Sequence, residues 1–398
     1  MADNLPEPSA TARLLASTTI SRLRLYTPDA ALMSAVAAGA PNVSLLVGVP
    51  NSDVPVLASS PSAAVSYASA NLLPFLPSLS AVSVGNEALS QDPSSLDPSL
   101  LLPAMENLLA SLPSPSSVKI STVHSMAILA QSDPPSSGAF HPELAGTLDP
   151  ILAFLSRTGA PLMINPYPWF AYSADPTPET LAFCLFQPNP GRADPASGLA
   201  YANMFDAQVD AVRAALAARG FGDVDVVVAE TGWPYRGDPD EPGATVDNAR
   251  AYTGNLVAHL RSLAGTPRVP GRSVDTYLFA LYDEDLKPGP TSERSFGLYR
   301  PDLTPNYDAG LAGAGPNPTN PTPAPASSSA QGSPIQPGWC VTAASVPGSG
   351  GTIQPASNCY VPSAVGSRRP GDYCCNGYCV WFGTMLLLQQ VSAWGVYI

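Results

Sequence analysis

The sequence predicts an α/β fold, and specifically a (β/α)8 barrel, from three observations. Short apolar segments alternate with longer helix-like segments over roughly the first 300 residues, as in folds built on a parallel sheet. The apolar segments are rich in Val, Ile and Leu and lack polar alternation, which is typical of strands buried on both faces. The 398 residues suffice for such a barrel, which takes about 250 residues, and for a smaller region.

The element order supports a barrel with one strand unaccounted for. Helices are predicted near residues 6–17, 29–38, 61–76, 99–112, 147–158, 202–219 and 245–265, many after Pro, Ser or Asp. Strands are predicted at residues 20–25, 43–49, 79–84, 118–123, 161–164, 224–228 and 274–278. A helix-like segment precedes the first predicted strand. We therefore interpret residues 20–25 as the second strand of a barrel that lacks its first, with an overlooked strand or an open sheet as alternatives.

The chain is expected to have three regions. Residues 1–312 form the barrel, and a long insertion at residues 166–200 separates two of its strands. Residues 313–337 are rich in Pro, Ser and Thr and are predicted to be a linker. Residues 338–398 form a small tail that holds five of the six cysteines. A tail this dense in cysteine indicates a disulfide-bonded module made in an oxidising compartment.

Composition and charge exclude several classes of function. Lys and Arg total 18 against 31 Asp and Glu, a net charge of −13, so neither nucleic acid nor an anionic membrane is the expected partner. The three histidines and the late cysteines match no zinc spacing, and no phosphate-binding glycine loop is present, so we expect no metal and no cofactor. The N-terminus has neither a basic nor an apolar segment, and a signal peptide is not predicted.

Two glutamates that follow predicted strands are candidate catalytic residues. In a (β/α)8 barrel the active site lies at the carboxyl ends of the strands. Glu87 follows residues 79–84 and Glu230 follows residues 224–228, so we expect the two to face each other across the barrel mouth. Paired carboxylates, one protonated and one ionised, are the groups that hydrolyse glycosides.

Other polar and aromatic residues end strands at the same rim. Asn86 is a candidate hydrogen-bond donor to a sugar hydroxyl, and aromatic rings are candidates to stack on sugars: Tyr26, Tyr167, Trp169, Phe170 and Trp233. Each feature also has a plain structural interpretation. Gly-Asn-Glu can simply end a strand, and the aromatic residues can cap the barrel. The charged residues of one group can form a solvated surface cluster: Glu284, Lys287 and Glu293.

The sequence also gives expectations for Cys184 and for the three histidines. Cys184 is expected to be a buried free thiol. His124 directly follows a strand and is a candidate to line the rim. His141 and His259 are expected to be surface or packing residues.

Several of these segments, in this order, resemble the plant glucan endo-1,3-β-glucosidases of glycoside hydrolase family 17. The resemblance covers about residues 3–310 and rests on four motifs: Ser-Val-Gly-Asn-Glu at 83–87, Asn-Pro-Tyr-Pro-Trp-Phe at 165–170, Val-Ala-Glu-Thr-Gly-Trp-Pro at 228–234 and Glu-Arg-Ser-Phe-Gly-Leu at 293–298. It implies a barrel with the acid/base after the fourth strand and the nucleophile after the seventh. This places residues 20–25 second in the barrel, as the element order does.

The resemblance also implies roles for individual residues. Glu87 would be the proton donor and Glu230 the nucleophile of a retaining hydrolase of β-1,3-glucan. Further residues would position these groups or contact the substrate: Tyr26, Asn86, Asn165, Tyr167, Trp233, Glu284, Lys287 and Glu293. This chain departs from the family in lacking its usual signal peptide and first strand, and in having Asp283 where Asn is usual. The alternatives are therefore a non-catalytic glucan-binding or inactive truncated homologue, and a mixed-linkage β-1,3-1,4-glucanase.

The tail carries a second resemblance. Gly-Trp-Cys-Val at 338–341 and Thr-Ile-Gln-Pro-Ala-Ser-Asn-Cys-Tyr at 352–360 resemble fragments of the family 43, or X8-type, carbohydrate-binding module. The closing residues do not follow that pattern, so an incomplete module is expected, and the apolar end is a poor match to a lipid-anchor signal. The resemblances imply a monomer located outside the cell or in the cell wall.

Overall fold

The computed structural model describes residues 2–89, 96–114 and 116–313, and three short strands beyond them. These are β14 (Asp372–Cys375), β15 (Tyr378–Trp381) and β16 (Val396–Tyr397). The chain divides into two compact units, one of Met1–Gly315 with Gly371–Ile398 and one of Pro316–Pro370. The predicted linker after residue 313, and the predicted tail apart from those strands, lie outside the described residues.

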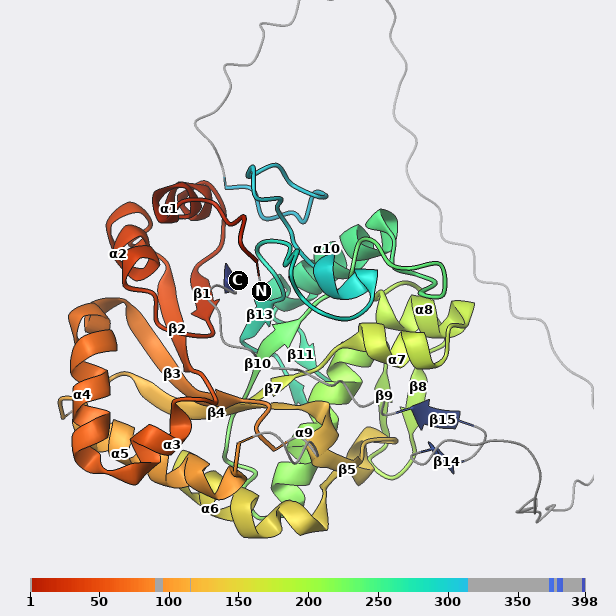
Figure 1. Cartoon of the computed structure of the whole chain (residues 1–398). Coiled ribbons are helices and arrows are strands. Elements are labelled where there is room, and N and C mark those ends of the chain that lie inside the picture. The colour runs from red at the N-terminus through yellow and green to blue at the C-terminus, as the bar shows by residue number, and fades with distance from the viewer. Residues whose placement is uncertain are drawn as a thin grey trace, which may run out of the picture. The chain divides into compact units, whose positions relative to one another are not determined.

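Parallel strands form the centre of the fold, and all seven predicted strand segments are confirmed. Each strand pairs in parallel with the next along the chain. They are β1 (Arg22–Leu25), β2 (Ser44–Val49), β3 (Leu79–Asn86), β4 (Lys119–Ser125), β7 (Leu162–Asn165), β10 (Val226–Thr231) and β13 (Thr276–Leu278). Figure 1 shows the helices lying outside the ring of strands.

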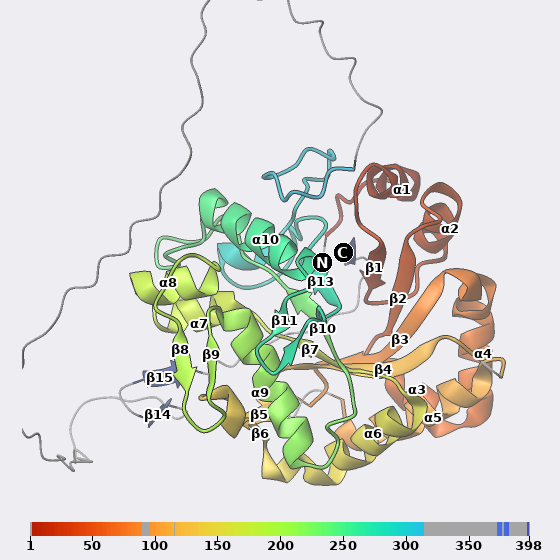
Figure 2. The same cartoon turned by 180° about the vertical axis from the view of Figure 1, so that it is seen from behind.

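Helices occupy the connections between the strands, as predicted. Side chains cap several of them, since Asp29, Ser60, Asn203 and Thr245 each accept a hydrogen bond from a backbone N–H in the first turn. Figure 2 shows the same arrangement from behind. The helices are α1 (Pro8–Ala16), α2 (Ala30–Gly39), α3 (Val54–Ser59), α4 (Pro61–Asn71), α5 (Leu101–Ser111), α6 (Ala145–Thr158), α9 (Met204–Ala218) and α10 (Val246–Arg261).

Short elements complete the connections. The 3-10 helices are η1 (Leu73–Ser78), η2 (Pro98–Leu100), η3 (Met126–Ile128), η4 (Pro135–Ser137), η5 (Pro142–Leu144) and η6 (Thr291–Arg294). Two antiparallel pairs are formed by β5 (Leu129–Gln131) with β6 (Ala139–Phe140) and by β11 (Gly265–Thr266) with β12 (Val269–Pro270). A third joins β14 and β15.

The sheet has apolar packing on both of its faces. A large cluster lies between the strands and the helices and includes Leu23, Leu45 and Val82. A small second cluster takes one residue from each of six strands, namely Leu46, Ala81, Val123, Met163, Ala229 and Tyr277. Alternate residues of a strand point to opposite faces, so this second cluster fills the interior of the barrel.

The barrel is nearly closed rather than complete. The parallel strands of the main sheet run from β13 to β1, and β16 is its last strand. β16 pairs antiparallel with the other side of β1, through Arg24 with Tyr397 and Leu25 with Val396. The described parallel strands therefore number seven, and the helix α1 precedes β1. This arrangement agrees with residues 20–25 taking the second position of an eight-stranded barrel.

The predicted insertion at residues 166–200 has regular structure. It contains α7 (Pro168–Ala174), α8 (Pro178–Cys184) and an antiparallel hairpin of β8 (Arg192–Asp194) with β9 (Leu199–Tyr201). Pro168 and Pro178 each open a helix, where a proline suits the first turn, and Thr177 caps the second helix. These helices are too short to give a clear periodicity, which is why the sequence indicated only a long connection.

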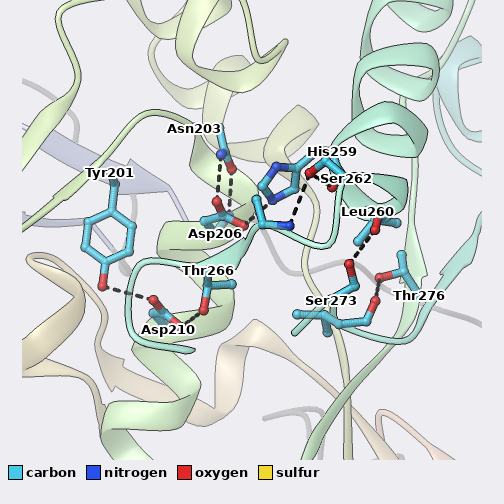
Figure 3. Close-up of polar contacts among 12 residues, drawn as sticks. Tyr201, Asn203, Asp206, Asp210, His259, Leu260, Ser262, Thr266, Ser273 and Thr276 are labelled. Atoms are coloured by element: carbon cyan, nitrogen blue, oxygen red, sulfur yellow. Dashed lines mark hydrogen bonds and ion pairs between the residues drawn. The ribbon is translucent and has the colours of Figure 1, made fainter. Parts of the chain in front are cut away.

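A buried polar network links α9 with α10 and with Tyr201 and Thr266 of the neighbouring connections (Figure 3). Asp206 of α9 accepts from the Asn203 side chain at 2.8 Å and lies 3.0 Å from Nε2 of His259 on α10. Asp210, one turn further on, accepts from the hydroxyls of Thr266 and Tyr201 at 2.6 and 3.2 Å. Because these buried carboxylates are fully partnered, the network holds the outer helices in place.

Candidate active site

Glu230 lies at the end of β10 and is buried, with 8% of its side chain area exposed. Nη1 of Arg24 donates to its Oε1 at 2.8 Å, and the Tyr26 hydroxyl donates to the same oxygen. The Tyr167 hydroxyl donates to Oε2 at 2.9 Å. A buried carboxylate with one cation and two hydroxyl donors is held in one orientation, and its ionised form is stabilised.

Arg24 also lies at this site, and the sequence analysis missed it. On β1 it shares a face with Arg22, while Leu23 and Leu25 pack outward against the helices, so its side chain enters the barrel interior. It is 1% exposed, and besides Glu230 it donates to the Ala229 carbonyl at 3.0 Å and to Oδ1 of Asn86 at 2.7 Å. The available signal was an arginine inside an apolar strand, where an unpaired charge is not tolerated.

Glu87 directly follows β3 and has a positive φ of 51°. This backbone conformation is unusual for a residue other than glycine and is often found at functional sites. The backbone N–H of Glu87 donates to the Val123 carbonyl at 2.8 Å. Nδ2 of Asn165, at the end of β7, donates to Oε1 of Glu87 at 2.7 Å. Glu87 is partly buried as a whole residue, whereas Glu230 is buried.

Asn86 links the two glutamates through its neighbours. Its side chain accepts from Arg24, which also holds Glu230, and its backbone precedes Glu87. Asn51, a second residue that sequence reasoning missed, fixes this backbone by accepting from the Asn86 N–H at 2.8 Å and donating to the Asn86 carbonyl at 3.0 Å. The structure therefore brings together the ends of β1, β3, β7 and β10.

Lys287 connects the loops that follow β13. Its Nζ lies 2.9 Å from Oε2 of Glu293 and 3.8 Å from Oε2 of Glu284, and 4.6 Å from the ring centre of Phe279. Glu284 and Glu293 are 8% and 7% exposed. The interpretation of these residues as a solvated surface cluster is therefore wrong, because the group is buried at the carboxyl end of the barrel.

Burial and charge act differently on the ionisable groups. Burial raises the pKa of Glu87, and the Asn165 hydrogen bond together with the positive charges of Arg24 and Lys287 only partly opposes it. Burial also raises the pKa of Glu230, and the positive charges of Arg24 and Lys287 oppose this rise only in part. Burial alone would lower the pKa of Lys287, but Glu293 and Glu284 raise it above its ordinary value, so the ammonium group stays charged.

Aromatic residues surround the glutamates, but not all of those predicted. The Tyr167 ring packs edge-on against Phe279 and Phe296, with ring centres 6.0 and 5.9 Å apart, and Phe170 beside it is 43% exposed. Trp169 and Trp233 are only 2% and 1% exposed. The prediction that their rings stack on a sugar is therefore not supported.

The two tryptophans pack against each other below the loop that follows β10. Their ring centres are 5.2 Å apart, and Nε1 of Trp233 donates to the Gly243 carbonyl at 2.9 Å. Gly232 precedes this ring and passes so close to the Phe279 carbonyl that a side chain there would clash. The Thr-Gly-Trp motif thus serves packing and close backbone approach at this position.

The remaining predictions for reactive side chains have mixed outcomes. Cys184 is buried and free, as expected. His124 does not follow its strand but lies within β4, fully buried, and burial lowers its pKa to about 3. It is therefore a packing residue rather than a rim residue. His141 pairs with Glu143 at 3.2 Å at the surface, and His259 belongs to the network of Figure 3.

No group of three or more His, Cys, Asp or Glu side chains in the described part of the chain is placed to hold a metal ion. No helix in the described residues is long and apolar enough to cross a membrane. The predictions of a reaction without metal or cofactor stay predictions.

A parallel barrel with two glutamates at the carboxyl ends of β3 and β10 has the architecture of a glycoside hydrolase. Comparison with known proteins gives the family. The family model described as "Glycosyl hydrolases family 17" matches residues 1–310, and the chain belongs to this family.

Relatives and a solved structure that are similar to this chain agree with the family assignment. The chain is 50% identical over 389 residues to a "Glucan endo-1,3-beta-glucosidase 7" of Arabidopsis thaliana, covering 92% of this chain and 75% of the relative. It is 48% identical to a "Glucan endo-1,3-beta-D-glucosidase" of Olea europaea, covering 92% and 82%. A solved structure of CJP38, a β-1,3-glucanase and allergen of Cryptomeria japonica pollen, has a TM-score of 0.72 and 37% identity, covering 77% and 95%.

Proposed function

We propose that the protein hydrolyses internal β-1,3-glucosidic linkages of β-1,3-glucan with retention of anomeric configuration. Relatives that carry the name of this activity support the substrate class. The roles of Glu230 as nucleophile and Glu87 as proton donor are supported by the difference between their hydrogen-bond partners. Glu230 faces a guanidinium and two tyrosine hydroxyls, whereas one amide donor contacts Glu87.

The proposed reaction has two steps. An oxygen of ionised Glu230 attacks the anomeric carbon while the bond to the leaving oxygen breaks and Glu87 delivers its proton to that oxygen. Glu87, now ionised, takes a proton from water, which attacks the anomeric carbon and releases Glu230. Arg24, Tyr26 and Tyr167 fix the attacking carboxylate throughout, which keeps reorganisation small.

Other residues have supporting roles in this proposal. Asn86 accepts a hydrogen bond from Arg24, and Asn165 donates one to Glu87. Both side chains are candidates to contact a sugar hydroxyl. Tyr26 and Tyr167 are candidates to line the substrate site. Lys287, held by Glu284 and Glu293, adds to the positive charge of Arg24 that partly opposes the effect of burial on Glu230.

The test is the action of the purified chain on laminarin, followed by NMR of the first product. The expected product is a β-anomer of internal cleavage, which mutarotates only later. An α-anomer would overturn retention, and an absence of new reducing ends with glucan still bound would favour a non-catalytic binding protein. Mixed-linkage β-1,3-1,4-glucan assayed in parallel separates the two linkage preferences, and faster cleavage of that polymer would overturn the β-1,3 assignment.

We also propose that residues 338–398 are an incomplete family 43 carbohydrate-binding module of a monomeric protein that acts outside the cell or in the cell wall. The motifs around Cys340 and Cys359 support this assignment. Its test is sedimentation of the full chain with insoluble β-1,3-glucan. Trp339→Ala should reduce the bound fraction if the tail binds glucan, and an unchanged fraction would contradict a binding tail.

A further inference from the structure

The turn between α2 and β2 carries an acceptor sequence for N-linked glycosylation, Asn42-Val43-Ser44. Such a sequence requires Asn, then any residue except Pro, then Ser or Thr. Two other asparagines, Asn317 and Asn320, have Thr two positions on, but Pro directly follows each of them. Asn42 is therefore the one asparagine of the sequence that meets the requirement.

The local structure presents Asn42 to solvent. The backbone N–H of Val43 donates to the Ala40 carbonyl at 2.9 Å and closes a four-residue turn, with Pro41 and Asn42 at its two central positions. Pro41 and Asn42 are exposed, whereas Val43 is 4% exposed and packs in the core. No hydrogen bond within the described residues holds the Asn42 amide, so its Nδ2 atom can be substituted without loss of a contact.

The surroundings of the turn leave room for a bulky, hydrated group. Ser44 begins β2, and its hydroxyl lies 3.5 Å from the Ser21 carbonyl, a contact at the limit of hydrogen bonding. The hydroxyl that the acceptor sequence requires is thus not committed to the fold. The three residues before the turn are small and exposed, namely Ala37, Ala38 and Gly39.

The position of Asn42 separates it from the end of the barrel that holds the two glutamates. Asn42 precedes the amino end of β2, which runs parallel to β3. Glu87 and Glu230 lie at the carboxyl ends of β3 and β10. A group attached to Asn42 therefore lies at the opposite end of the barrel and leaves the candidate active site open.

We propose that Asn42 carries an N-linked oligosaccharide. In its attachment, Nδ2 of Asn42 forms a bond to the anomeric carbon of an N-acetylglucosamine on a lipid diphosphate donor, and the amide loses one proton. The bond from that carbon to the phosphate oxygen breaks, and the lipid diphosphate leaves. The modification takes place in the secretory pathway, so the inference rests on the proposed location outside the cell and not on the proposed hydrolysis.

The experiment is mass spectrometry of the full chain, exported from plant cells behind a cleavable secretory leader. Cleavage at acidic residues releases a peptide between Asp29 and Asp53 that contains both Asn42 and Asn51. Treatment with a peptide N-glycosidase in heavy-oxygen water should label Asn42 and leave Asn51, which lies outside the acceptor sequence, unlabelled.

Three variants sharpen the measurement. Ser44→Ala should abolish the label and Ser44→Thr should keep it, because the acceptor sequence requires a hydroxyl at this position. Asn42→Gln should also lack the label. Its kcat/KM on laminarin should stay within about twofold of wild type, because the exposed turn is remote from the glutamates.

Four outcomes would overturn the inference. They are an unlabelled Asn42 in the wild-type chain, a label that persists in Ser44→Ala, equal labels on Asn42 and Asn51, and a large change of kcat/KM in Asn42→Gln. Thermal unfolding checks each variant, and the wild-type peptide decides the question should a variant fail to fold. Glu230→Gln should carry the same label as wild type, so failure of the hydrolysis proposal and failure of this one are distinguishable.

Discussion

Glu230 and Glu87 are the same amino acid at the ends of two strands of one barrel, yet their neighbours differ. Around Glu230 the chain places Arg24, Tyr26 and Tyr167. Around Glu87 it places the side-chain amide of Asn165, which donates one hydrogen bond to the carboxyl group. Burial raises the pKa of both glutamates and the charge of Arg24 opposes it at both, so the difference lies in direct contacts. Arg24, Tyr26 and Tyr167 donate hydrogen bonds to Glu230, which favours its ionised form and supports the proposed roles.

The largest expected effect comes from removing the proposed nucleophile, Glu230. Glu230→Gln should lower kcat on laminarin by about 1,000-fold or more, because no covalent intermediate can form. Binding of laminari-oligosaccharides, measured by calorimetry, should persist. Glu106→Gln, an exposed glutamate on α5, is the matched control. Normal turnover by Glu230→Gln would show that Glu230 is not the nucleophile.

The next effect distinguishes Glu87 from Glu230. Glu87→Gln should lower kcat on laminarin by about 100-fold or more, the usual contribution of a general acid. Its first step should recover on an aryl β-glucoside with a good leaving group, because such a group departs without a proton. The measurement is the burst of released aryl group. Recovery in Glu230→Gln instead would reverse the two roles.

A smaller effect concerns pH. Removing the positive charge in Arg24→Gln should raise the pKa of Glu230, because Arg24 is the cation that lowers it most. Glu230 must be ionised to attack, so activity should be lost at a higher pH as the solution is acidified. The acidic limb of the kcat/KM profile reports this shift. Arg24→Lys keeps the charge and should move the limb less; equal shifts in both variants would show that charge is not the cause.

The smallest effect separates packing residues from substrate-binding ones. Trp233→Phe removes the hydrogen bond to the Gly243 carbonyl and should cost about 1 kcal/mol of unfolding free energy. KM for laminarin should stay within about twofold, because the buried ring has no face for a sugar. Thermal unfolding and steady-state kinetics check the two parts. A large rise in KM would restore Trp233 as a substrate contact.

The sequence predicted the parts of the site that depend on local pattern. Glu87, Asn165 and Glu230 end apolar strands, and parallel strands bring such ends together. Arg24 and Asn51 could not be assigned this way, because their roles depend on partners 206 and 35 residues away in the chain. Trp233 was misjudged for a related reason, since its burial depends on Trp169 and Tyr172 of the insertion at 166–200.

The place of Arg24 on β1 has a consequence for how the protein loses activity on heating. β1 is the terminal parallel strand of the sheet, joined to β2 on one side and to the two-residue strand β16 on the other. Terminal strands open by local fluctuation at lower free energy than central ones. Each opening withdraws Arg24 from Glu230 while the other strands stay paired. Inactivation should therefore precede global unfolding, with amide hydrogens of β1 exchanging before those of β3 and β4.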